Sequence, residues 1–85
     1  MKINGIKAEV TSIGSLYVVT IRDDSKEADE LKEKIAESPC GMRATETSPT
    51  FLSDVYERFG NSKNSFVFTA NEYEYSLPHY FNVSR

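Results

Sequence analysis

The sequence predicts an α+β fold, with a mainly antiparallel sheet of four or five strands and two α-helices packed on one face. Apolar and polar residues alternate with the period of a β-strand near both ends of the chain, whereas the middle carries two apolar stripes with helical spacing. The element order is therefore hairpin, helix, short strand, helix, hairpin. One sheet covered on one face by both helices buries every stripe. The 85 residues make one domain, 1–85.

The first hairpin is predicted in the stretch GIKAEVTSIGSLYVVTIRDD. A two-residue turn at positions 13–14 places Val10 opposite Tyr17. It also places Ala8 opposite Val19, so inward residues meet inward residues. Because side chains alternate along a strand, a slip by one residue would turn the whole apolar set outward.

The first helix is predicted in DDSKEADELKEKIAESPCG. Asp24 and Glu27 have the spacing of a capping box at its start. Proline and glycine follow its end, where they stop a helix. A narrow apolar stripe faces the sheet and consists of Ala28, Leu31 and Ile35.

The second helix is predicted over residues 48–59, in SPTFLSDVYERF. Ser48 caps it, and Pro49 lies in the first turn, where its missing N–H is not needed. Gly60 follows as the stop signal. The helix has a broad apolar face made of Phe51, Leu52, Val55, Tyr56 and Phe59.

The second hairpin is predicted in SFVFTANEYEYSL, residues 65–77. A turn at 71–72 brings Phe68 opposite Tyr75. The same turn brings Phe66 opposite Leu77, so the crowded rings form one inward face. We therefore interpret these aromatic residues as core.

Two shorter segments are less constrained by their patterns. In residues 42–45, apolar Met42 and Ala44 alternate with polar residues, which indicates a short strand between the helices. The tail 78–85 is compatible with a strand, a cover for the sheet or a binding segment.

Charge and hydropathy exclude several classes of partner. Ten Lys and Arg residues against 13 Asp and Glu residues give a net charge of −3. This charge provides no electrostatic footprint for nucleic acid or an anionic membrane, so we expect no membrane partner, and nucleic acid is not the expected partner. No segment has the length and hydropathy of a membrane helix or the pattern of a signal peptide. We expect a cytoplasmic protein.

The residue inventory does not indicate catalysis. Cys40 and His79 are the only residues of their types, so they supply neither a disulfide nor the usual ligand set of a zinc site. Cys40 has no base close to it in sequence, and the glycines do not form a phosphate-binding loop. We expect a non-enzymatic protein without a metal or cofactor.

Two segments resemble the RNA recognition motif family. LYVVTI (16–21) resembles its first signature strand and precedes a capped helix, as in that family. KNSFVFTA (63–70) resembles the end of its second signature, although both signature glycines are missing. The resemblance implies single-stranded nucleic-acid binding through Tyr17 and either Phe66 or Phe68 on the sheet.

The function expected first is that of a small protein-interaction domain that covers a partner's surface. The partner is another protein or a second copy of the chain; size and charge match many bacteriophage and mobile-element accessory proteins, including inhibitors. The alternatives are the nucleic-acid-binding domain above and a self-assembling structural subunit. If one sheet face is free of helices, its apolar residues mark the contact surface. The predicted partner-binding residues are Leu16, Val18, Arg22, Val67, Tyr80 and Phe81.

Overall fold

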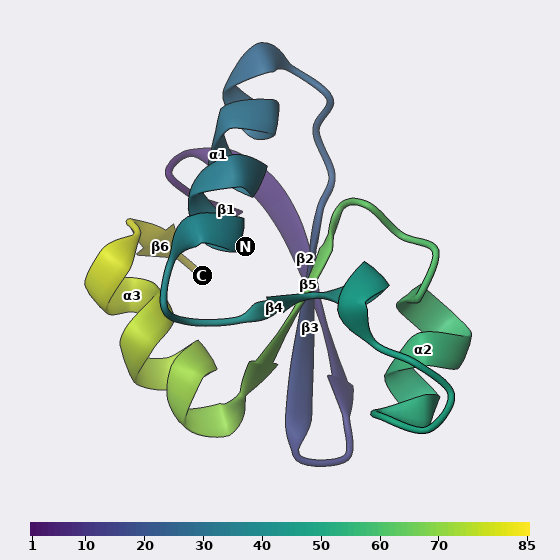
Figure 1. The fold of residues 1–85 in the computed structure, drawn as a ribbon. Coiled ribbons are helices and arrows are strands. Elements are labelled where there is room, and N and C mark those ends of the chain that lie inside the picture. Colours follow the sequence, from purple (N-terminus) through teal and green to yellow (C-terminus); the bar gives the residue numbers. More distant parts are fainter.

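A six-stranded antiparallel sheet runs through the molecule in the order β4-β5-β3-β2-β1-β6 (Figure 1). The computed structural model describes residues 1–85 and confirms the predicted α+β class. The strands are β1 (Lys2–Ile3), β2 (Ile6–Ile13), β3 (Leu16–Ile21), β4 (Met42–Arg43), β5 (Ser65–Thr69) and β6 (Val83–Ser84). The helices are α1 (Lys26–Glu37), α2 (Ser53–Phe59) and α3 (Leu77–Tyr80).

The predicted first hairpin is β2–β3, but its register differs by two residues. Val10 lies opposite Val19 and Ala8 lies opposite Ile21. The turn is at residues 14–15, because Gly14 adopts a φ of +59° and takes the first turn position. A shift by two residues keeps each side chain on its predicted face.

A preceding hairpin joins β1 to β2 and was not predicted. Its turn is Asn4-Gly5, with positive φ values of 52° and 82°. Ile3 pairs with Ile6 across this turn. Asn-Gly between apolar residues is the strongest short-range hairpin signal, so the sequence did contain it.

Helix α1 buries the predicted stripe of Ala28, Leu31 and Ile35. Its cap is Ser25 and not Asp24, because the Ser25 hydroxyl accepts the Ala28 amide at 3.2 Å. The helix connects β3 to the short strand β4, and β5 lies between these two strands. This arrangement is a split β-α-β unit.

The second helix is shorter than predicted and lies on the other face of the sheet. It begins at Ser53, because residues 48–51 form a closed turn and Leu52 is left-handed with φ 58°. Figure 1 shows the sheet edge-on, with α2 on one side and α1 and α3 on the other. The expectation that both predicted helices share one face is therefore wrong.

The second hairpin is also wrong, because residues 70–80 are helical. A π-helical turn, Glu72–Ser76, leads into α3. Thr69 and Glu72 cap this segment reciprocally: the Thr69 amide donates to Glu72 Oε1 at 2.8 Å, and the Glu72 amide donates to Thr69 Oγ1 at 3.2 Å. Tyr73 and Leu77, four residues apart, are buried, whereas Tyr75 is 69% exposed.

The sheet separates two apolar cores. The larger core lies under α1 and α3 and includes Val19, Ile21, Phe66 and Phe68. The smaller core lies under α2 and consists of Val18, Ala44, Val55 and Val67. Both faces of the central strands are therefore covered.

Candidate functional site

The apolar residues predicted to form a free sheet face lie under α2. Val18 is fully buried and Val67 is 4% exposed. Leu16 is half-buried and packs against the same core. The prediction that this face is free is wrong for Val18 and Val67, because both are buried in one cluster with Val55 of α2.

The other predicted contact residues are not brought together with that face. Arg22 is exposed and paired with Glu9, its Nη2 2.9 Å from Glu9 Oε2. Tyr80 is 53% exposed on α3, whereas Phe81 is 9% exposed and belongs to the larger core. The tail therefore packs on the opposite side of the sheet from Leu16.

Two large aromatic residues near α2 are exposed to solvent, Phe51 by 53% and Tyr56 by 40%, and Phe51 is the more exposed of the two. A tight turn fixes its backbone: the Ser48 amide donates to Phe51 O at 3.0 Å, and the Phe51 amide donates to Ser48 O at 3.1 Å. The Ser48 hydroxyl accepts the same Phe51 amide at 3.1 Å. Ser-Pro at the start of a four-residue segment is typical of such a turn, so the signal was present in the sequence.

Leu52 redirects the chain directly after Phe51. Its left-handed conformation, φ 58° and ψ 55°, is uncommon for a residue other than glycine. The reversal turns Leu52 toward the smaller core while Phe51 stays exposed. Strained backbone of this kind concentrates at functional sites.

A hollow of about 350 Å³ lies between the β2–β3 turn and the start of α2. Thr50 and Leu52, the two neighbours of Phe51, both line it. Asp54 is the one charged residue among its walls, which are otherwise apolar, small or hydroxyl-bearing. The full lining is Ile13, Gly14, Ser15, Leu16, Thr50, Leu52, Ser53, Asp54 and Val55.

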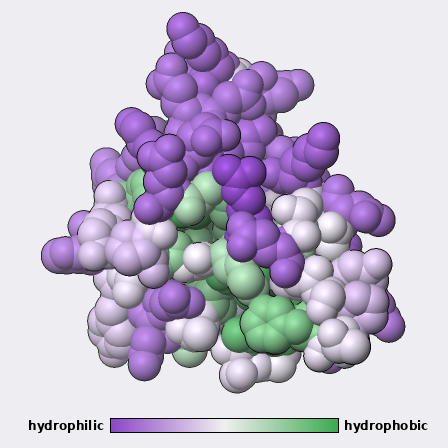
Figure 2. Space-filling view, in the orientation of Figure 1, coloured by the Kyte–Doolittle hydropathy of each residue, from purple (hydrophilic) through white to green (hydrophobic).

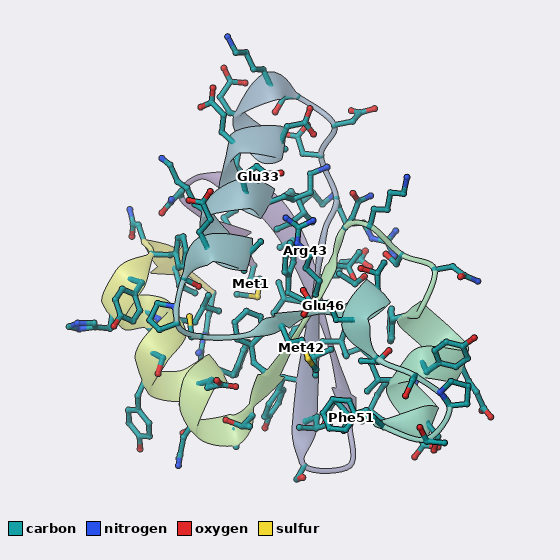
Figure 3. The ribbon with its side chains drawn as sticks, viewed as in Figure 1. Met1, Glu33, Met42, Arg43, Glu46 and Phe51 are labelled. Carbon is teal, nitrogen blue, oxygen red and sulfur yellow. The ribbon has the colours of Figure 1, made fainter.

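The Phe51 side chain forms part of an apolar surface. Figure 2 shows green atoms at the place where Figure 3 labels Phe51, with Met42 next to it on the same face. Polar Arg43 and Glu46 lie above them in this view. Ile13, Leu16 and Leu52 line the hollow, and Leu52 adjoins Phe51 in the chain; we call these four residues the Phe51 corner.

Comparison with known proteins finds no matching family model, no matching curated protein and no matching solved structure. None of the helices has the length and apolar character needed to cross a membrane. No group of three or more His, Cys, Asp or Glu side chains is placed to hold a metal ion.

Neither of the two residues considered for catalysis, Cys40 and His79, lines the hollow. Cys40 is 1% exposed, and its Sγ lies 3.4 Å from the Ser38 hydroxyl. His79 is exposed, and its ring meets the edge of Tyr80 at a centroid distance of 4.9 Å.

The rings required by the resemblance to RNA recognition motifs are not displayed on an open sheet. Phe66 and Phe68 are 1% and 0% exposed beneath the helices. Tyr17 is half-buried and stacks on Tyr73 at a centroid distance of 4.5 Å. These three aromatic residues are therefore engaged in packing.

Proposed function

We propose that the chain is a non-enzymatic protein-interaction domain that binds a partner protein through the Phe51 corner. The observation that carries the proposal is an aromatic side chain, 53% exposed, on a turn closed by reciprocal backbone hydrogen bonds. A side chain presented by fixed backbone loses little conformational freedom on binding. Aromatic residues in this situation are frequent anchors of protein interfaces.

The hollow beside Phe51 supports a protein partner with a protruding apolar side chain. Ile13, Leu16 and Leu52 supply apolar wall, while Thr50 and Ser53 supply hydroxyl groups near it. An apolar centre with a polar rim is the usual anatomy of a protein interface. In this arrangement Phe51 covers partner surface while the hollow receives a partner side chain.

The proposal is tested by comparing Phe51→Ser with Tyr75→Ser. Both variants remove an exposed ring, but Tyr75 is 69% exposed on the other side of the sheet. Proteins retained from the native host by the immobilised parent are purified and titrated against all three chains. We expect Phe51→Ser to weaken the partner's affinity at least about tenfold and Tyr75→Ser to leave it unchanged.

The outcome that contradicts the proposal is equal affinity of a purified partner for the parent and for a folded Phe51→Ser chain. Melting temperatures of both variants that match the parent's show that the two changes leave the fold intact. A partner lost only with Tyr75→Ser would move the contact to the face that carries α3.

A further inference from the structure

The outer edge of β2 is open along its second half. β1 pairs with residues 6–7 of β2. Met1 then extends this pairing by one residue, because the Ala8 amide donates to Met1 O at 3.0 Å and the Met1 amine donates to Ala8 O at 3.3 Å. Beside residues 9–13 the sheet has β3 on one side and no strand on the other.

The direction of the backbone groups identifies which of them are unpaired. Arg22 donates its amide to Lys7 O at 2.9 Å, so Lys7 faces β3. Ala8 faces β1, and successive residues of a strand alternate in direction. The N–H and C=O groups of Val10 and Ser12 therefore point outward, past the end of β1. Both residues are exposed, Val10 by 42%.

Part of the opposite edge of the sheet is capped by a side-chain carboxylate. There the Glu72 carboxylate accepts the Thr69 amide at 2.8 Å and the Gly41 amide at 3.5 Å. Natural sheet edges are commonly protected by charges, proline or very short strands. Residues 8–13, AEVTSI, contain no proline, glycine or lysine, and the single charge, Glu9, is paired with Arg22.

We propose that a second copy of the chain binds to this edge, with the two β2 strands antiparallel about a twofold axis at Thr11. In this register Val10 lies opposite Ser12 of the second copy, and Ser12 lies opposite its Val10. Each pair exchanges both backbone hydrogen bonds, so every unpaired group on the two edges gains a partner. The free edge is thus complementary to itself.

The side chains fit the same register. Thr11 meets Thr11 of the second copy, a favourable cross-strand pair. Glu9 lies opposite Ile13 of the second copy, so no like charges face each other directly. The overlap covers residues 9–13 and stops before Ala8, whose outer side Met1 occupies. The pair is closed by its twofold symmetry and leaves no edge for a third copy at this position.

The inference concerns a different surface from the Phe51 corner and is tested on the purified chain. Sedimentation equilibrium over a dilution series should give a mass that rises from one chain toward two. Backbone amide exchange should slow at Val10 and Ser12 as the concentration rises. The amides of Glu9 and Thr11, which face β3, should be protected at every concentration.

Two variants should prevent the edges of two copies from pairing without changing the hydrogen bonds within the single chain. Val10→Lys adds a charge that must approach its counterpart across the axis. Val10→Pro removes an outward N–H that has no partner in the single chain. Both should remain one chain at all concentrations, whereas Tyr75→Lys, a charge added on the π-helical turn that precedes α3, should associate like the parent.

Four results would overturn the inference. The parent would remain one chain at every concentration, or it would associate while Val10 and Ser12 amides exchange freely. Association of Val10→Lys at the parent's strength would likewise place the contact elsewhere. Growth beyond two chains would contradict the closed pair.

Discussion

At the scale of single residues, backbone conformation decides what the side chains can do. Leu52 and Phe51 are neighbours of similar hydropathy, yet one packs into a core and the other is exposed, because Leu52 adopts φ 58°. A helix over 48–59 would have placed both on one face. The Ser-Pro turn signal and the helix-cap signal overlap at Ser48, so the residue pattern alone could not decide between them.

Backbone conformation also decides which residue can stand at position 41. Gly41 has a φ of +82° and lies close to the Phe68 ring. A Cβ at this position would lie 2.6 Å from Phe68 Cε1. We predict that Gly41→Ala destabilises the fold by about 2–4 kcal/mol, from the left-handed backbone and the overpacking together. The decrease in the free energy of unfolding is measured by urea denaturation monitored by circular dichroism.

Gly5→Ala is the matched control, since Gly5 has the same φ of +82° and nothing within 4 Å of its Cβ position. Gly5→Ala should lower the free energy of unfolding only by the cost of the left-handed backbone, about 1–2 kcal/mol. Equal losses in the two variants would show that the Phe68 ring does not lie against Gly41.

At the scale of elements, the sequence predicted α1 because its apolar residues keep one helical period. It predicted β3 and β5 because short runs rich in β-branched and aromatic residues favour strands. Residues 69–81 were wrongly predicted as part of a hairpin, since Tyr73, Tyr75 and Leu77 fit strand alternation. The same segment also holds a helical pattern, Tyr73, Leu77 and Phe81, preceded by the Thr69–Glu72 capping box. The capping box is the local signal that favours the helix over the hairpin.

Helix α2 holds the smaller core in place through Val55, which is 1% exposed. We predict that Val55→Asp abolishes the cooperative thermal transition, because an unpaired carboxylate would be buried against Val18 and Val67. Tyr56→Asp, at a side chain that is 40% exposed on the same helix, should melt close to the parent. A folded Val55→Asp chain with the parent's melting temperature would mean that α2 does not pack through this residue.

At the scale of the whole molecule, the sheet is covered on both faces. This determines where contacts with other molecules can form. The continuous apolar run LYVVTI is typical of a strand buried on both sides, and β3 is such a strand. The sequence did not indicate which helix covers which face, because even and odd residues of β3 are both apolar. The prediction of a free sheet face around Val18 was wrong for that reason. The apolar surface near α2 is instead at the Phe51 corner, and the unpaired backbone is at the β2 edge.

The central claim, that α2 covers the second sheet face and leaves Phe51 exposed, is tested most directly by NMR with a soluble paramagnetic probe. The probe broadens the resonances of side chains that solvent reaches. The account predicts strong broadening of the Phe51 ring, similar to that of the exposed Tyr75 ring, and little broadening of the Val18 and Val67 methyl groups. Methyl resonances of Val18 and Val67 broadened as strongly as the Phe51 ring would contradict it.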